Sequence, residues 1–487
     1  MKKLFTLLLL VGAITAQAKV YTLADLARIV GTLENTYEKN DATITETVGV
    51  TVDGNVYTIT IPTGLAEGVT GIGYDDNNII LSKNYLTLVE GNDLIVSEGE
   101  TLLFAGAAQL EMSGTLVAYD ATFGAAEGSE NTAKGFRIYG DHTMATFGNC
   151  TFNYVGVNFG SSEGALLVVG CDFNQHNAKG GNSAINFTSS CTGNIVKDCT
   201  FTNCQLSGVA SGGNTGVGIT IEDCDFERDF AVNRLYPHIN MSLSGNRDVT
   251  IDGNRVIGAK VNSRAGGIAV SNLLGGTYTG TVYVRNNYVE GNSYGITLTG
   301  GGSIVIENNQ VVDNKYIASA MSGGSGINIT CNTSSSVGKA YIRGNLIEGN
   351  LWGVTVIGSV DINAGKVDNP AAEDYNPGEN VFIDNGNGGV LYDWYNNTTA
   401  TSYAQGNIWN VTEQTQDDIE QVIFHQVDDA TLGEVIFMPP HEINTAITDI
   451  EAAPAVADGV YYNILGQPVT HPTTGLYIHN GQKVLVK

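Results

Sequence analysis

Two kinds of side chain in this sequence could act on a ligand, and both gather in its second half. Aromatic rings can stack on the apolar faces of sugar rings, and carboxylates can accept hydrogen bonds from hydroxyl groups. Aromatic caps packed inside turns, and acidic loops that are simply solvated, are the alternative interpretations. The candidate ligand-binding residues are Tyr294, Trp352, Asp374, Tyr392, Asp393, Trp394 and Tyr395.

The sequence contains no spacing typical of a metal site. CxxC and HxH spacings are both absent, so no structural or catalytic zinc is expected. No cofactor is expected either, although the carboxylates of Asp361, Asp368, Glu373, Asp374 and Asp393 could bind calcium. No catalytic residue can be assigned from these spacings.

The framework that must position these side chains is visible as one column of residues. Its members are 21 to 36 residues apart, and each is followed two residues later by an apolar residue. A recurrence at this period indicates a coil of stacked supersecondary units. The column consists of Cys150, Cys171, Cys199, Cys224, Asn254, Asn287, Asn309, Asn345, Asn380 and Asn407.

Each unit contains about three very short strands. Apolar residues alternate before the column, and a Gly followed by a β-branched residue, as in Gly295-Ile296, opens another strand after it. Asn and Gly allow the left-handed backbone that sharp corners need. If the coils stack in parallel, the Asn side chains bond to the turns above and below.

The four cysteines of the column predict a buried ladder of thiols, because Cys is small and readily buried. The chain has seven cysteines, and an odd number does not suggest a disulfide framework. Cys191 and Cys204 lie near the ladder, so one disulfide pair is left open as the alternative.

This pattern resembles the right-handed parallel β-helix family, whose first members were pectate lyases, from about Asn78 to Trp409. The resemblance implies an all-β solenoid with an N-terminal cap, a C-terminal helical cap and a small C-terminal β-module. Leucine-rich repeats are the alternative fold. The Val- and Ile-rich core, the irregular period and the second strand signal in each unit argue against them.

The ends of the chain predict secretion. Lys2 and Lys3 precede a short apolar run, and Ala16-Gln17-Ala18 fits a signal-peptidase site. No other segment is long and apolar enough for a transmembrane helix. The expected division is a signal peptide at 1–18, an N-terminal cap at 19–77, the β-helix with its C-terminal cap at 78–440, a spacer at 441–458 and a module at 459–487.

The terminal regions also carry local signals. Leu23 to Val30 and Gln416 to His425 have helical spacing. The segment from Tyr461 to Lys487 is similar to the C-terminal sorting tails of secreted Bacteroidetes proteins of the type IX system, and an inert β-tail is the alternative.

The net charge of −27 argues against nucleic acid as a partner.

The family resemblance implies two enzyme classes as candidates, galacturonan hydrolases and pectate lyases. Galacturonan hydrolases carry Asn-Thr-Asp and Gly-His-Gly motifs, which are absent here. Pectate lyases need a calcium cluster and a basic residue, and the densest comparable group is Asp223, Asp225, Glu227, Arg228, Asp229 and Arg234. Because alternate strand residues point outward, a solvated strand face is the favoured interpretation of that group.

The expected function is therefore non-catalytic binding or adhesion at the cell surface or outside the cell, to a glycan or to a host or neighbouring cell. A polysaccharide lyase or related carbohydrate-active enzyme is the alternative. Insertions on repeat scaffolds usually carry binding. Three are expected along one edge, at Ser271–Thr281, Cys331–Lys339 and Gly358–Glu379.

Overall fold

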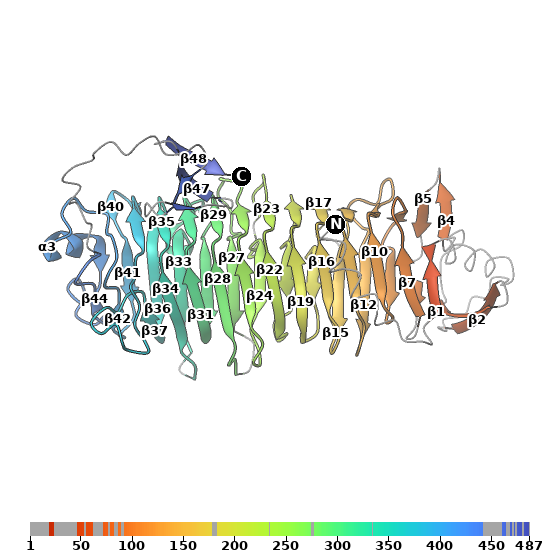
Figure 1. Cartoon of the computed structure of the whole chain (residues 1–487), viewed down its shortest axis with the longest axis horizontal. Coiled ribbons are helices and arrows are strands. Elements are labelled where there is room, and N and C mark those ends of the chain that lie inside the picture. Colours follow the sequence, from red (N-terminus) through yellow and green to blue (C-terminus); the bar gives the residue numbers. More distant parts are fainter. Residues whose placement is uncertain are drawn as a thin grey trace. The chain divides into compact units, whose positions relative to one another are not determined.

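The computed structural model describes residues 19–23, 46–52, 55–61, 72–75, 78–81, 86–88, 92–177, 183–232, 234–273, 277–333 and 335–441, and short segments between 460 and 486. It divides into two compact units, Met1–Ile219 and Thr220–Lys487, each built almost entirely of short strands (Figure 1). The expected signal peptide, and most of the helix expected from Leu23 to Val30, lie outside the described residues.

The strands of the first unit form three sheets. Sheet one contains β1 (Lys19–Thr22), β7 (Asn92–Val96), β10 (Leu116–Tyr119), β13 (Ala145–Gly148), β16 (Leu166–Val169) and β19 (Cys191–Lys197). Sheet two contains β4 (Ile72–Asp75), β5 (Asn78–Leu81), β8 (Thr101–Phe104), β11 (Thr122–Ala125), β14 (Thr151–Asn153), β17 (Asp172–Asn174) and β20 (Thr200–Thr202). Sheet three contains β2 (Glu46–Val52), β3 (Asn55–Ile61), β6 (Leu86–Leu88), β9 (Gln109–Met112), β12 (Gly135–Gly140), β15 (Gly156–Ser161), β18 (Ile185–Phe187) and β21 (Val209–Ser211).

The second unit repeats the arrangement, and the division between the units falls within β22 (Val217–Glu222) of sheet one. Its sheet one contains β25 (Val249–Asp252), β28 (Thr281–Arg285), β31 (Gly302–Glu307), β34 (Gly338–Arg343), β37 (Val360–Asn363), β42 (Ser402–Tyr403) and β44 (Val435–Ile436). Its sheet two contains β23 (Asp225–Glu227), β26 (Arg255–Ile257), β29 (Tyr288–Glu290), β32 (Gln310–Val312), β35 (Leu346–Glu348) and β38 (Val381–Ile383). Its sheet three contains β24 (Ile239–Ser242), β27 (Ile268–Asn272), β30 (Ile296–Gly300), β33 (Ser325–Cys331), β36 (Trp352–Gly358), β41 (Trp394–Asn397) and β43 (Ile423–Phe424).

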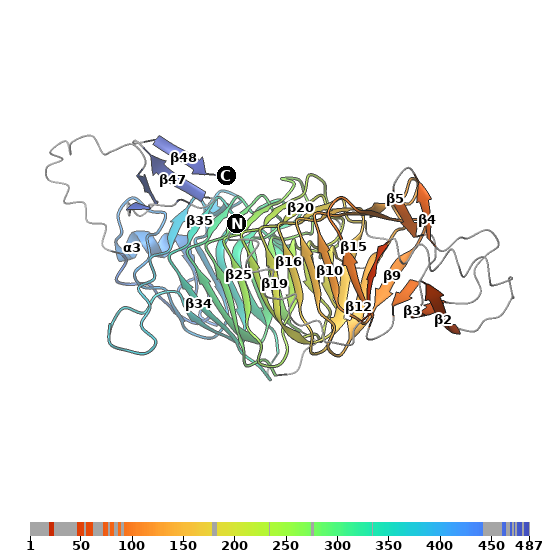
Figure 2. The same cartoon turned by 45° about the vertical axis from the view of Figure 1, so that its right-hand side comes forward.

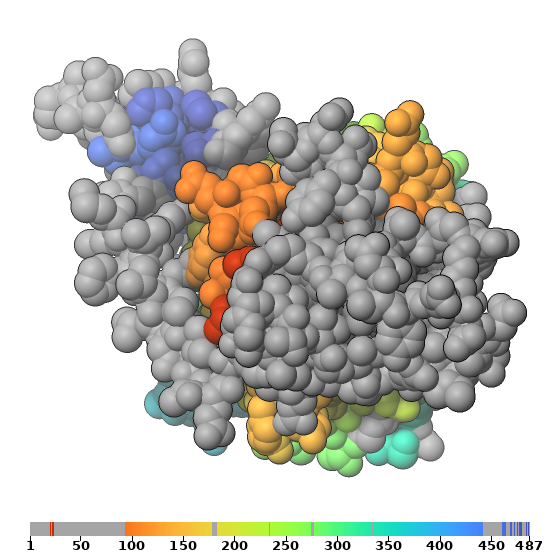
Figure 3. All heavy atoms as spheres, turned by 90° about the vertical axis from the view of Figure 1, so that its right-hand side faces the viewer, coloured from red at the N-terminus to blue at the C-terminus, as the bar shows by residue number. Residues whose placement is uncertain are grey.

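Each coil visits sheets one, two and three in turn, and a strand pairs in parallel with its equivalent in the next coil. In the first unit, β10, β16 and β19 can be followed in Figure 2, and β1 lies beside β7 at the end seen in Figure 3. The pairs β2–β3, β3–β6 and β4–β5 are antiparallel. The parallel stack of three-stranded coils is a parallel β-helix, as the sequence predicts.

The corner between sheets one and two is made the same way in every coil of the column. The residue before each column member has a positive φ, from 51° to 69°. This left-handed conformation turns the chain sharply and aims the next side chain inward. Asn149, Asn286 and Asn308 are the asparagines in this position, and Gly, Asp or Glu fills it elsewhere.

The asparagines of the column form a continuous buried ladder in the second unit. Asn309 Nδ2 donates to Asn345 Oδ1 at 2.9 Å and to the Val284 carbonyl at 2.9 Å, and its backbone N–H donates to the same Asn345 oxygen. The same pattern links Asn254, Asn287, Asn309, Asn345, Asn380 and Asn407. The side chains thus satisfy corner backbone groups that water cannot reach.

A second ladder occupies the corner between sheets two and three. Asn292, Asn314 and Asn350 each donate from the side-chain amide to the next member, ending at Asn385. Asn385 in turn donates to Asp393 Oδ1 at 3.3 Å. The second ladder therefore stops at a buried carboxyl group.

In the first unit, thiols replace amides at the same corner. The Cys150 N–H donates to Cys171 Sγ at 3.3 Å, and the Cys199 thiol donates to the Val168 carbonyl at 3.6 Å. All seven cysteines of the chain are buried and free, so the open alternative of a disulfide pair is not observed. Behind the ladder, Phe152, Phe173 and Phe201 stack nearly parallel at 4.4 and 4.9 Å.

The helical segment expected at Gln416 to His425 is shorter in the structure. It consists of α3 (Gln416–Ile419) and the 3-10 turn η4 (Glu420–Val422), after which Ile423 begins β43. Ile419, Val422 and Ile423 are buried, as the helical stripe predicts. The last residues form an antiparallel sheet of β45 (Tyr461–Tyr462), β46 (Pro468–Val469), β47 (Gly475–His479) and β48 (Gln482–Val486).

Two of the three expected insertions emerge at equivalent corners, and the third does not. The segments after β27 and β33 both lead from sheet three to sheet one. The third begins with a regular strand, β37, and the extra residues, 364–379, follow it on the way to β38 of sheet two. The prediction of one shared edge is wrong for this insertion, because Val360–Asn363 pairs with β34 as part of sheet one.

The Asn ladder yields a stability prediction. Replacing Asn309 by Ala leaves buried corner groups unpaired, which costs about 1–3 kcal/mol of unfolding free energy. Chemical denaturation followed by tryptophan fluorescence measures this loss. Asn332→Ala, at an exposed position, is the matched control, and an equal loss in both variants would contradict the ladder's role.

Candidate functional site

A group of half-exposed aromatic rings lies on the outer face of sheet three in the second unit. We call Trp352, Tyr392, Tyr395 and Phe424 the aromatic cluster. The Trp352 ring centroid is 4.8 Å from that of Tyr392 and 4.9 Å from that of Tyr395, and the last two are 6.0 Å apart. Tyr395 stacks on Phe424 at 4.8 Å with an interplanar angle of 9°.

Strand register explains why these rings meet. Tyr395 of β41 and Phe424 of β43 are direct partners in parallel strands, and both side chains point outward. Trp352 opens β36, and its indole N–H donates to the Ala320 carbonyl of the 3-10 turn η3 (Ala320–Ser322) at 3.1 Å. Tyr392 directly follows the hairpin of β39 (Gly386–Asn387) and β40 (Val390–Leu391) and lies two residues before the start of β41.

Small polar side chains continue the same outward row along the sheet. Thr297, Asn328 and Thr355 are successive register partners, and Thr355 is the partner of Tyr395. Thr297 Oγ1 donates to Asn328 Oδ1 at 3.0 Å, and Thr330 Oγ1 donates to the same oxygen at 2.8 Å. Thr297 and Thr355 are buried and Asn328 is half-exposed, so the accessible part of this row beyond the aromatic cluster is the Asn328 side chain.

Tyr294 holds the position expected for it but packs against the neighbouring coil. Ile296 and Ile327 are register partners, and so are Ser325 and Trp352. Tyr294 lies two residues before Ile296, and Ser325 lies two residues before Ile327. Tyr294 therefore holds the same position in its coil as Trp352 does two coils later. A Cβ atom at Gly266 would lie 2.0 Å from the Tyr294 ring, so the ring covers this glycine. Burial of the hydroxyl raises the pKa of Tyr294. The Tyr294 ring therefore caps the turn and offers little free surface to a ligand.

Two of the predicted ligand-binding residues lie inside the molecule. Trp394 is fully buried, because its strand partners Val354 and Ile423 also point into the core. Asp393 is fully buried as well, and it accepts hydrogen bonds from Asn385 Nδ2 and from the Asn410 N–H at 2.8 Å. Neither side chain offers surface to a ligand.

Asp374 is exposed, but it belongs to the 364–379 loop beside sheet one. It forms an ion pair with Lys366 of the same loop. The structure thus brings Trp352, Tyr392 and Tyr395 together and leaves Asp374 on a different face. Phe424 and the Thr–Asn row were not predicted, since only strand register places them beside Tyr395.

The acidic and basic group considered for lyase chemistry is engaged in structural contacts. Arg255 Nη1 lies 2.7 Å from Asp225 and 3.1 Å from Glu227 across neighbouring strands of sheet two. Arg228 is buried and donates to the Tyr236 carbonyl. Within the described part of the chain, no group of three or more His, Cys, Asp or Glu side chains could hold a metal ion.

The comparisons with known proteins bear on the fold. The family model described as a right handed beta helix region matches residues 134–347. The fold is the right-handed parallel β-helix. No curated protein matches this sequence.

Three solved structures are similar, all of mutants of the periplasmic alginate epimerase AlgG. A double mutant shares 12% identity over 69% of this chain and 75% of that chain, with a TM-score of 0.41. A single mutant shares 12% identity over 74% and 76%, with a TM-score of 0.40. Identities this low say nothing about what this chain binds.

The buried carboxyl at the end of the second ladder yields a pH prediction. Burial raises the pKa of Asp393 to about 7, while the hydrogen bonds from Asn410 and Asn385 partly oppose the rise. Between its ordinary value near 4 and about 7, the folded state holds a proton that the unfolded chain has released. Stability should therefore fall as pH rises through this window, by up to about 4 kcal/mol.

Denaturation of the wild type and of Asp393→Asn at pH 5 and pH 8 tests this prediction. The variant has no proton to lose and should lack the fall in unfolding free energy. Glu413→Gln, an exposed control, should behave like the wild type. Equal pH dependence in wild type and Asp393→Asn would show that another group is responsible.

Proposed function

We propose that this protein is a secreted, non-catalytic glycan-binding protein, and that the aromatic cluster holds a neutral polysaccharide by ring stacking. The observation that carries the proposal is the cluster's half-exposed position on the outer face of sheet three, in the same register row as the half-exposed amide of Asn328. Glycans present apolar ring faces and hydroxyl edges, and this surface offers a partner for each.

The geometry favours an extended ligand. Parallel strands are about 4.8 Å apart, so Thr297, Asn328, Thr355 and Tyr395 follow one another at a constant interval. A chain of hydroxylated rings lying across the strands could stack on Trp352 or Tyr395 and bond to the half-exposed Asn328 side chain beyond Thr355. The net charge of −27 favours a neutral glycan over an acidic one, because like charges repel.

The proposal also includes export to the cell surface. The basic residues and apolar run before Ala18 support a signal peptide, and the Tyr461 to Lys487 segment supports a sorting role. No helix among the described residues is long and apolar enough to cross a membrane.

The binding prediction concerns the exposed rings. Trp352→Ala and Tyr395→Ala should each weaken retention by a neutral polysaccharide about threefold to tenfold, because each removes a stacking surface. Affinity electrophoresis on a panel of neutral and acidic polysaccharides measures retention. Tyr288→Ala, on the outer face of sheet two, is the aromatic control.

The same panel separates the two function classes. Thermal unfolding of each variant shows whether a loss of retention follows from lost structure. Retention that survives both substitutions would refute the proposed site. Absorbance from unsaturated sugar products would instead support the polysaccharide lyase alternative.

The module prediction concerns the C-terminal sheet. Removing residues 459–487 should leave the thermal unfolding of the coils unchanged while abolishing surface display, as detected by antibody labelling of intact cells. Loss of cooperative unfolding in the truncated chain would show that the module is part of the β-helix. Unchanged display would favour an inert tail.

A further inference from the structure

The 364–379 loop and the outer face of sheet one line an open depression of about 410 Å³ in the second unit. We call it the loop pocket. Its volume falls within the range of small-molecule sites. Its chemically distinctive lining residues are Lys339, Tyr341, Asp361, Lys366, Asp374 and Tyr403.

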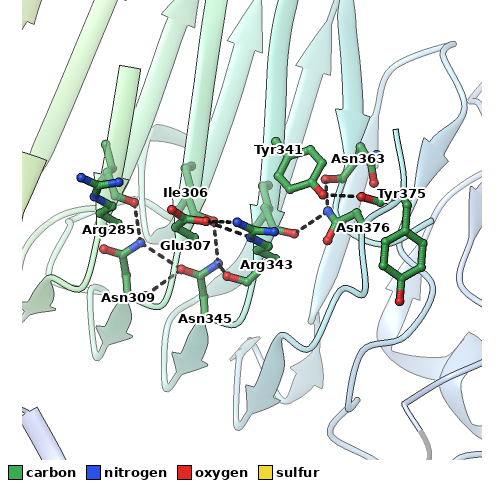
Figure 4. A network of polar contacts seen from close by, with 12 residues as sticks. Arg285, Ile306, Glu307, Asn309, Tyr341, Arg343, Asn345, Asn363, Tyr375 and Asn376 are labelled. Carbon is green, nitrogen blue, oxygen red and sulfur yellow. Dashed lines mark hydrogen bonds and ion pairs between the residues drawn. The ribbon is translucent and has the colours of Figure 1, made fainter. Parts of the chain in front are cut away.

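The wall of the loop pocket is held in place by a polar network (Figure 4). Asn376 is fully buried, and its Nδ2 donates to the Ile342 carbonyl at 3.1 Å and to the Asn363 carbonyl at 2.8 Å. The Tyr341 hydroxyl donates to the Tyr375 carbonyl at 2.6 Å. These bonds tie the loop to β34 and β37, so the pocket is preformed.

Two charged residues of the loop pocket are neighbours in strand register but form no ion pair with each other. Lys339 and Asp361 are direct register partners on β34 and β37, and both are exposed. Among the ion pairs and hydrogen bonds of the described residues, none engages either side chain. By contrast, Lys366 pairs with Asp374, and Arg343 pairs with Glu307 at 2.6 Å. The backbones that carry an ammonium, which only donates, and a carboxylate, which only accepts, are thus about one strand spacing apart.

Tyrosine rings flank this pair in the next outward column. Tyr341, Asn363 and Tyr403 are successive register partners, so the backbones of the two tyrosines are about two strand spacings apart with the smaller Asn363 between them. Lys366 Nζ lies 4.5 Å from the centroid of the Tyr403 ring. The floor of the pocket therefore combines aromatic carbon with fixed hydrogen-bonding groups.

The charges decide which class of ligand fits. Two cations and two carboxylates line the loop pocket, so an anion would meet Asp361 and Asp374, and a cation would meet Lys339 and Lys366. A pair of adjacent hydroxyl groups avoids both conflicts, because one hydroxyl can accept from Lys339 while the other donates to Asp361. Hexopyranoses carry such pairs on a ring of suitable size.

We propose that the loop pocket binds one neutral hexopyranose, with adjacent hydroxyls shared between Lys339 and Asp361 and the ring resting beside Tyr341 and Tyr403. The inference rests on the proposed function for its ligand class. It assigns a second site, on a different sheet from the aromatic cluster and sharing no residue with it.

Saturation-transfer NMR on the full chain tests the second site. The probes are methyl β-D-glucopyranoside, methyl β-D-galactopyranoside and methyl α-D-mannopyranoside, each at the same concentration. At least one should receive saturation from the wild type. Its dissociation constant should rise about tenfold in Lys339→Met and in Asp361→Asn, because each loses a hydrogen bond to a charged group. Lys260→Met, which breaks a surface ion pair with Glu290 elsewhere, should have no effect.

The outcomes separate this proposal from the proposed function. Saturation that is lost with Trp352→Ala and kept with Lys339→Met would place the sugar on the aromatic cluster and overturn the loop pocket. Absence of saturation for all three probes would overturn it too, as would stronger binding of methyl β-D-glucuronopyranoside. Unchanged thermal unfolding of Lys339→Met and Asp361→Asn confirms that lost binding is not lost folding.

Discussion

The asparagine-to-asparagine hydrogen bond at the corner between sheets one and two is the interaction on which the rest of the second unit depends. Each side-chain amide donates to a carbonyl of the coil before it, as Asn309 does to Val284, and its oxygen accepts the backbone N–H of the asparagine in that coil, as Asn345 does for Asn309. A residue with left-handed backbone geometry precedes each member. Because this corner repeats without slippage, every outward side chain acquires a fixed neighbour in the next coil.

That constancy produces both candidate binding surfaces. On sheet three it aligns Thr355 with Tyr395 and Tyr395 with Phe424, which continues the Thr–Asn row into the aromatic cluster. On sheet one it aligns Lys339 with Asp361 and sets Tyr341 and Tyr403 on either side of Asn363. In neither case are the residues close in sequence. The surfaces are properties of the stack and would be lost if one coil shifted by a single residue.

The sequence predicted the stack well because the column is a local signal repeated many times. The surfaces are harder to predict, because they depend on which residues of each strand point outward. The spacing predicts both Trp394 and Tyr395 as ligand-binding candidates, yet neighbouring residues on a strand point to opposite faces, and Trp394 lies in the core. One sequence pattern does indicate the aromatic residues of sheet one: Tyr283, Tyr341 and Tyr403 each lie four residues before a ladder asparagine. No sequence pattern indicates that Lys339 and Asp361 are register partners, because this register depends on where the 364–379 insertion leaves the coil.

The position of that insertion has a consequence for how such a chain can diversify. The extra residues leave and rejoin at the ladder corner itself, and Asn380 resumes the hydrogen-bonded series directly afterwards. The entropic cost of closing a flexible loop grows only with the logarithm of its length, by about 0.6 kcal/mol for each doubling. Lengthening or recasting this loop is therefore thermodynamically inexpensive relative to altering any coil. The loop that forms one wall of the loop pocket can therefore change in length or sequence while the strands on either side keep their pairing partners.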